Sequence, residues 1–443
     1  MNILKKIYCR IFQKCFHVAI PLLPYREPEL IRGFAGVPGV LAEKKISRVM
    51  LVTDPGVYGL GLTEPLEDLL KAAGIFVSVY KDTVANPTSA NVEEARRQYL
   101  QDQCQGLIAF GGGSSMDCAK GIGARLARPG KSLARMEGIL KVMRRLPLLI
   151  AIPTTAGTGS ETTLAAVITD ADTHHKYAIN DFFLIPDYAV LEPEITAGLP
   201  PQLTATTGMD ALTHAVEAYI GRSTTRQTRD AAVLAICLIF ENLERAYRDG
   251  KDLDARACML KASYLAGTAF TKSYVGYVHA VAHSLGGRYG IAHGLANAVL
   301  LPIVLREYGA SVYGKLARLA RLTGISSAAS DKEAAESFIE HIQKMNDDMK
   351  IPGTLQGIRK EDIPTLAAYA DHEANPLYPV PVLWNASKLE RIYHLVQEEQ
   401  KRDRTGNQTD SGKAAWAFPG RSNIAGFFPA FPASEAEGWN PAL

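Results

Sequence analysis

Hydrophobic periodicity changes character near residue 195, and this change constrains the fold more than any other feature of the sequence. Before it, helical stretches alternate with short apolar runs, which read "RVMLVTD", "IFVSVY", "GLIAF" and "LPLLIAIP". This alternation predicts a mostly parallel sheet covered on both faces, and "TLAAVITD" and "KYAIND" predict an additional antiparallel hairpin. From 202 to about 347 the periodicity is helical almost throughout. We therefore predict an α/β domain over 26–197 and an all-helical domain over 198–401.

Two end segments lie outside these domains. Residues 1–25 are basic, and apolar side chains recur in them at helical spacing, at Leu4, Ile7, Ile11, Cys15 and Val18. The apolar part is too short and too broken by proline for a signal peptide, so we expect a helix packed on the protein body in preference to one on a membrane surface. Residues 402–443 are rich in Gly, Pro, Ser and Asn without periodicity, which predicts a disordered tail.

Charge and cysteine usage exclude some classes of protein. The chain has 48 basic and 46 acidic side chains among 443 residues, a formal net charge of +2, and so lacks the basic field that nucleic-acid binding needs. No run reaches the roughly 20 apolar residues of a membrane span. The six cysteines include no CxxC pair, which indicates free thiols in a reducing compartment. We expect a cytoplasmic protein.

Two polar loops in the α/β half could hold a nucleotide. "GLIAFGGGSSMDCAKGIG" is a strand, three glycines and a helix, although Met116 occupies the third glycine position of the Rossmann fingerprint. Asp54 ends the first strand, where its carboxylate could accept a hydrogen bond from a ribose hydroxyl or simply form a turn. "IPTTAGTGSE" adds a second loop with four hydroxyl side chains after a buried strand. Either loop alone could be structural, but two on one sheet edge favour a nucleotide.

Histidines and an aspartate in the helical half suggest a metal site. Asp210 and His214 are four residues apart on a predicted helix and so share a face. "GYVHAVAHSLGGRYGIAHG" then places His279, His283 and His293 within nineteen residues. The metallopeptidase pattern HExxH is ruled out because position 280 is alanine. Hydrogen-bonded core histidines are the alternative, but the clustering favours a metal.

Four motifs together resemble the iron-containing (group III) alcohol dehydrogenase family. They are "FGGGSSMDCAKGIG", "IPTTAGTGSE", "GMDALTHAVEAY" and "GYVHAVAHSLGGRYGIAHGLANAVLLP", and the likeness runs from about residue 26 to about residue 399. The resemblance implies an α/β dinucleotide domain and a helical domain, as in dehydroquinate synthase, with the site in the cleft between them. It also implies a homodimer or larger homo-oligomer.

The same resemblance implies roles for particular residues. The metal ligands would be Asp210, His214, His279 and His293, and His283 would lie beside the metal and the nicotinamide. The NAD contacts would come from Asp54, Asn86, Gly112, Gly113, Ser114, Asp117, Thr154, Thr155, Thr158 and Lys176. No ligand position departs from the family pattern.

The expected chemistry is hydride transfer between a small alcohol and NAD, giving an aldehyde or ketone. One carboxylate and three imidazoles leave an open position on a divalent ion, which would lower the pKa of the substrate hydroxyl. His283 would relay the released proton. The resemblance favours Fe²⁺, while the mixed N/O ligands would also accept Zn²⁺.

Two alternatives remain open. A glycerol dehydrogenase or another NAD- and metal-dependent enzyme of the superfamily, such as a cyclase, would share the architecture. The cyclase would need clustered basic residues for a phosphate, and few occur near 260–295. A non-catalytic structural or assembly protein retaining the fold would be expected to have lost ligands, and none is lost.

Overall fold

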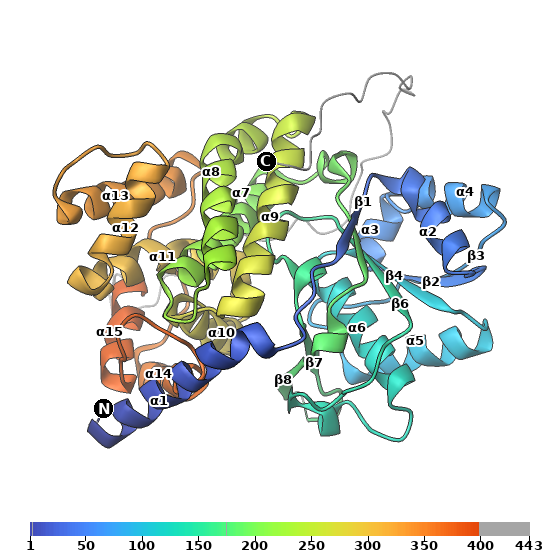
Figure 1. The fold of residues 1–443 in the computed structure, drawn as a ribbon, viewed down its shortest axis with the longest axis horizontal. Coiled ribbons are helices and arrows are strands. Elements are labelled where there is room, and N and C mark those ends of the chain that lie inside the picture. Colours follow the sequence, from blue (N-terminus) through green and yellow to red (C-terminus); the bar gives the residue numbers. More distant parts are fainter. Residues whose placement is uncertain (2, 174, 398–443) are drawn as a thin grey trace, which may run out of the picture. The chain divides into compact units, whose positions relative to one another are not determined.

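The computed structural model describes residues 1, 3–173 and 175–397, so the predicted tail at 402–443 lies outside the described residues. Figure 1 shows an α/β half, coloured blue to green, and a helical half, coloured green to red. Both belong to one compact unit, Met1–Glu398, and the boundary at 197/198 stays a prediction.

The main sheet contains six parallel strands. Their order is β1 (Glu29–Ile31), β9 (Tyr188–Val190), β6 (Leu148–Pro153), β4 (Gly106–Gly111), β2 (Arg48–Val52) and β3 (Phe76–Tyr80). A second sheet pairs β8 (Lys176–Asn180) with β5 (Gly138–Ile139) in parallel and with β7 (Ala165–Thr169) in antiparallel orientation. The mostly parallel sheet is therefore confirmed, and the predicted hairpin is β7–β8.

Alternate side chains of the central strands enter two different cores. On β2, Met50 and Val52 pack in one cluster with residues of α5 (Ser89–Gln101) and α6 (Gly113–Ala127). Val49 and Leu51 pack on the other face with α2 (Val37–Glu43) and α4 (Glu64–Ala72). Both faces of the sheet are covered, which explains why these strands read as continuous apolar runs.

The described residues after 200 form helices around one large core. The helices are α7 (Pro201–Ile220), α8 (Arg226–Arg248), α9 (Leu253–Ser273), α10 (Tyr277–Tyr289), α11 (His293–Tyr308), α12 (Tyr313–Leu322), α13 (Asp331–Asp348), α14 (Ile363–Ala374) and α15 (Ala386–Val396). Helix α7 contacts α8, α9 and α11, so almost all its side chains are buried. Polar groups on such a helix need partners inside the protein.

The predicted N-terminal helix is present as α1 (Ile3–Ala19), and it packs on the helical half. Arg10 donates to the carbonyls of Val380 and Pro381, and Gln13 donates to those of Pro376 and Tyr378. The packing face is nevertheless different from the predicted one. The five apolar positions of the sequence pattern are exposed, namely Leu4, Ile7, Ile11, Cys15 and Val18. The packed side instead carries Arg10 and Gln13, which bind backbone carbonyls, together with the buried Cys9 and with Phe16, whose ring packs against Tyr274.

Within the described part of the chain, no single helix is both long and apolar enough to cross a membrane. The bent pair His293–Ser311 and Tyr313–Leu322 meets that test only when its two helices are taken together.

Candidate active site

The glycine loop lies where β4 meets α6. Gly111 has a φ of +152°, and a side chain there would collide with Ser115. Gly112 precedes the first turn of α6 and makes no side-chain cap, so the N–H groups of this turn remain available to an anion such as a pyrophosphate. The second loop is adjacent, because the Thr154 N–H donates to the Gly111 carbonyl at 3.1 Å.

The remaining threonines predicted to contact NAD also lie beside these glycines. Thr155 Oγ1 lies 3.9 Å from the position that a β-carbon on Gly112 would take. Thr158 Cγ2 lies 3.3 Å from the corresponding position on Gly113. The structure thus brings Gly112, Gly113, Thr154, Thr155 and Thr158 together at the carboxyl edge of the sheet.

Three further predicted NAD residues meet although they come from distant segments. Lys176 Nζ donates to Asn86 Oδ1 at 2.7 Å, and the Asn86 N–H donates to Ser114 Oγ at 3.3 Å. Asn86 has a φ of +57°, a conformation that asparagine tolerates better than most residues. Burial lowers the pKa of Lys176, and the charge of Asp117 partly opposes that effect.

Two predicted NAD contacts are already engaged with the protein. Asp54 Oδ1 accepts from the N–H groups of Gly56 and Val57 and so caps the short helix α3 (Pro55–Gly59). Asp117 is half-buried, and desolvation raises its pKa, while its two oxygens accept from Ser160 Oγ and the Val167 N–H. Asp117 therefore fastens α6 to the second loop and to β7, whereas Asp54 Oδ2 has only a 3.4 Å contact with Ser115.

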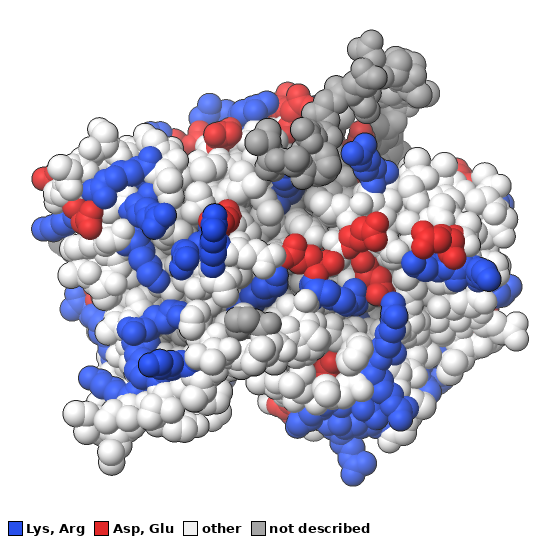
Figure 2. All heavy atoms as spheres, in the orientation of Figure 1, with Lys and Arg blue, Asp and Glu red and all other residues white. Residues whose placement is uncertain are grey.

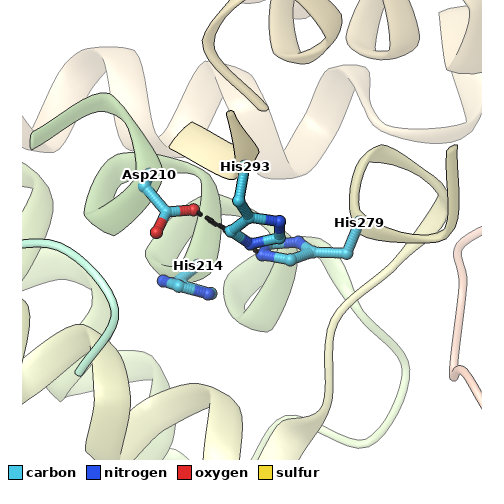
Figure 3. A group of neighbouring side chains, drawn as sticks. All are labelled: Asp210, His214, His279 and His293. Carbon is cyan, nitrogen blue, oxygen red and sulfur yellow. Dashed lines mark ion pairs between the residues drawn. The ribbon is translucent and has the colours of Figure 1, made fainter. Parts of the chain in front are cut away.

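The four predicted metal ligands form one cluster (Figure 3). Asp210 and His214 come from α7, His279 from α10 and His293 from the start of α11. One donor atom of each residue lies within 4.8 Å of the others. Asp210 Oδ1 lies 3.5 Å from His293 Nε2 and 4.0 Å from His279 Nε2.

Close helix packing holds His293 beside α7. Gly294 follows it, and a β-carbon there would lie 2.5 Å from the Thr206 carbonyl oxygen. Glycine therefore allows the first turn of α11 to approach α7 within the reach of the Asp210 side chain.

A buried glutamate orients one histidine. Glu217 accepts hydrogen bonds from the N–H groups of Gly276 and Val278 and from His279 Nδ1, the last at 2.6 Å. Because Nδ1 carries the proton and donates it in a hydrogen bond to Glu217, a neutral His279 presents an unprotonated Nε2 to the cluster. Burial raises the pKa of Glu217 to about 7, and the three donors act against that shift.

The protonation states of the histidines, and the shortage of hydrogen-bond donors for the acceptor atoms of the cluster, suit a divalent cation. Burial lowers the pKa values of His214 and His279, and that of His293 to about 4, so all three imidazoles are neutral as metal ligation requires. Asn297 Nδ2 lies within 3.2 Å of three acceptors, namely Asp210 Oδ1, His279 Nε2 and His293 Nε2. An amide has two hydrogens for these three acceptors. His214 Nδ1 is buried without a hydrogen-bond partner. The donors present therefore fit a metal ion.

His283 lies next to this cluster with different partners. Its ring stacks on His293 with centroids 5.2 Å apart, and 44% of its side chain is exposed. His283 Nδ1 lies 2.6 Å from Glu373 Oε1, which also accepts from the Tyr378 hydroxyl. Desolvation lowers the pKa of His283, but the charge of Glu373 and its hydrogen bond outweigh this and raise the pKa above its usual value.

The second loop of the α/β half packs against the helical half. Between the two halves, a β-carbon on Gly267 of α9 would lie 2.8 Å from the Gly159 carbonyl oxygen. The charge of Lys176 is close enough to lower the pKa values of both His283 and His293.

Comparison with known proteins identifies the family. Two protein-family models match the sequence. The family model described as "Iron-containing alcohol dehydrogenase" matches residues 33–193, and the one described as "Fe-containing alcohol dehydrogenase family, C-terminal" matches residues 204–396. The chain belongs to the iron-containing alcohol dehydrogenase family.

Relatives and solved structures support the assignment. Alcohol dehydrogenase 4 of Schizosaccharomyces pombe is 41% identical over 337 residues, which cover 74% of this chain and 79% of the relative. The structure of a 1,3-propanediol oxidoreductase is 37% identical with a TM-score of 0.80, covering 84% of this chain and 98% of that one. Sulfoacetaldehyde reductase from Bifidobacterium kashiwanohense, solved with NAD⁺, has 27% identity and a TM-score of 0.75 at the same coverages.

The chain is thus an NAD-dependent alcohol dehydrogenase, an oxidoreductase of a family that uses NAD and a divalent metal. Its reaction interconverts an alcohol and its aldehyde or ketone.

Three side chains beside the proposed metal site are not among the residues predicted from the sequence. Glu217 carries a usable signal, since it lies three residues after His214 as a charged residue in an alanine-rich helix. Asn297 lies four residues after His293 and so shares its helix face. Glu373 lies 90 residues from its partner His283, and no local pattern connects the two.

Proposed function

We propose that Asp210, His214, His279 and His293 hold the divalent metal of this dehydrogenase, and that NAD binds along the two loops after β4 and β6. The observation that carries the proposal is the convergence of one carboxylate and three neutral imidazoles from three helices, with donor atoms within 4.8 Å. A structural protein that merely retained the fold would have no reason to keep this set.

A metal held by these four residues would lower the pKa of the substrate hydroxyl, and NAD would supply the hydride acceptor. The protein's part is to hold the donors in place. Glu217 fixes the His279 tautomer, and the α6 N-terminus offers N–H groups to the pyrophosphate. We propose Fe²⁺ as the native ion on the strength of the family, while this set of nitrogen and oxygen donors also suits Zn²⁺.

We propose that His283 takes the substrate proton and passes it toward water. Its partial exposure and its hydrogen bond to Glu373 support this role, because the carboxylate stabilises the protonated imidazole. Tyr378 donates to the same Glu373 oxygen and so keeps that carboxylate in position.

We further propose a cytoplasmic location and a homodimeric or larger assembly. The location is supported by the six cysteines, all of which are free. The only support for the assembly is that members of the family often form dimers or larger oligomers.

A substrate panel tests the proposed function. Protein stripped of metal and reconstituted with Fe²⁺ or Zn²⁺ is mixed with NAD and ethanol, methanol, 1,3-propanediol or glycerol, and NADH formation is followed by absorbance. We expect NADH formation that needs added metal and is fastest with one of the first three alcohols. Metal-independent activity would contradict the metal assignment, and activity with glycerol alone would favour the glycerol dehydrogenase alternative.

A further inference from the structure

The N-terminal helix α1 buries one side and exposes the other. Its buried side carries Cys9 and Gln13, and Arg10 and Gln13 reach the loop at 376–381. At 100° per residue, Leu4, Ile11 and Val18 lie along one line on the opposite side, with Ile7 and Cys15 to either side of that line. Figure 1 shows α1 on the outer surface of the helical half.

This exposed side is strongly apolar. Six large hydrophobic residues of α1 have exposed fractions between 50% and 74%, namely Ile3, Leu4, Ile7, Tyr8, Ile11 and Val18. Leu22 continues the surface just beyond α1, with an exposed fraction of 84%. Contiguous apolar patches on a soluble protein commonly mark a surface that binds something. We name the seven residues from Ile3 to Leu22 the α1 apolar face.

The charge around the α1 apolar face is positive. Residues 1–26 contain three lysines and two arginines and no aspartate or glutamate. Lys6, Arg10 and Lys14 are spaced by four residues and follow one flank of the helix, with Lys6 and Lys14 exposed. In Figure 2 the lower left of the molecule, where α1 lies, is largely uncharged, with basic side chains above it.

We propose that α1 lies in the surface of an anionic membrane, with the α1 apolar face in the headgroup boundary and the catalytic body outside the bilayer. The apolar side of such a helix can enter the boundary with the acyl chains, while the lysines on its flank pair with the anionic headgroups. The seventeen residues of α1 are also too few and too charged to span a bilayer.

The positive charge around the α1 apolar face favours an anionic membrane over a second copy of the chain as its binding partner. A two-fold contact through the α1 apolar face would place the same patch on both partners, bringing lysines toward lysines without any acidic residue in this segment. An anionic membrane instead supplies the opposite charge. Because the α1 apolar face is the side of the helix that faces away from the body, lipid could reach it without unfolding the contacts of Arg10 and Gln13.

Vesicle co-sedimentation of the full-length metal-loaded protein tests the proposal. Vesicles of neutral phosphatidylcholine are compared with vesicles in which about a third of the lipid is phosphatidylglycerol. We expect binding to the anionic vesicles, weakening as salt rises. The double variant Ile7→Glu/Ile11→Glu should bind about tenfold less or worse, because it places two charges in the apolar layer. Lys6→Glu/Lys14→Glu should also lose binding to anionic vesicles.

A matched control carries the same charge change elsewhere. Leu60→Glu/Leu322→Glu alters two exposed leucines outside α1 and should bind vesicles like the wild type. NADH formation in solution should be unchanged in all variants, which shows that they are folded. The proposal is overturned if the wild type stays in the supernatant with anionic vesicles, or if Ile7→Glu/Ile11→Glu binds as well as the wild type. It is equally overturned if that variant instead abolishes a dimer seen by light scattering without vesicles.

Discussion

His279 Nδ1–H donates a hydrogen bond to Glu217 Oε2 at 2.6 Å, and both side chains are almost completely buried. The same carboxylate binds the N–H groups of Gly276 and Val278 at the start of α10. One glutamate on α7 therefore fixes the position of α10 and the tautomer of the histidine that α10 carries.

Replacing Glu217 by glutamine should weaken metal binding. The amide keeps one accepting oxygen, loses the other and carries no negative charge, so it makes His279 a poorer metal ligand, and we expect an affinity loss of about 10- to 100-fold. Metal affinity is measured by competition with a chelator, beside turnover at saturating metal. Unchanged affinity would mean that Glu217 serves only to hold α10.

The three histidines near the cluster should separate into two groups. His279→Ala and His293→Ala remove proposed donor atoms and should lose both metal and activity. His283→Ala should keep metal near the wild-type stoichiometry and lower turnover, by about 10²-fold or more for a lost acid–base group. Elemental analysis and turnover are measured on all three variants. If His279→Ala keeps its metal and His283→Ala loses it, then His283 is the metal ligand and His279 is not.

Asp54 should favour NAD over NADP. A carboxylate at the ribose repels a 2′-phosphate, so Asp54→Asn should lower the NAD-to-NADP ratio of kcat/KM by about tenfold or more. Asparagine also caps helices well, so this variant keeps the start of α3, whereas Asp54→Gly removes both the charge and the side-chain cap. The ratio of kcat/KM is measured for both cofactors. Equal use of NADP by the wild type would place Asp54 away from the ribose.

Glu161 should make stability depend on pH. Its two oxygens are buried without hydrogen-bond partners, and burial raises its pKa from 4.5 to about 7. Between these values the unfolded chain releases a proton that the folded protein keeps, so the free energy of unfolding falls as pH rises through this window.

Glu161→Gln removes this ionisation and should be more stable than the wild type by about 1–3 kcal/mol at pH values above 7, with a smaller difference near pH 4.5. Urea unfolding at both ends of the window measures the difference. Glu340→Gln, on an exposed position of α13, is the control and should behave like the wild type at both ends. A Glu161→Gln advantage that is the same at both ends would contradict the raised pKa.

Local patterns in the sequence predicted much of this fold and site. Strand β2 and its neighbours are buried on both faces and so appear as apolar runs, and Asp210 and His214 appear together because they are one helical turn apart. The contact between His283 and Glu373 depends on how α10 meets α14, which no spacing along the chain encodes. The packed side of α1 depends in the same way on distant residues, since Arg10 and Gln13 bind carbonyls at 376–381 and Phe16 packs against Tyr274.

The placement of α1 also bears on how the two halves can move. Helix α1 packs on the helical half, and β1 then enters the main sheet, so the chain passes between the halves once before β1 and again between β9 and α7. The first connection is tied down where Tyr264 donates to the Pro28 carbonyl and Lys272 pairs with Glu27. Two bodies joined at two points turn most easily about the line through those points. If the dinucleotide loops open away from the histidines, the two connections would favour a hinge rotation about that line over a twisting or sliding of the halves.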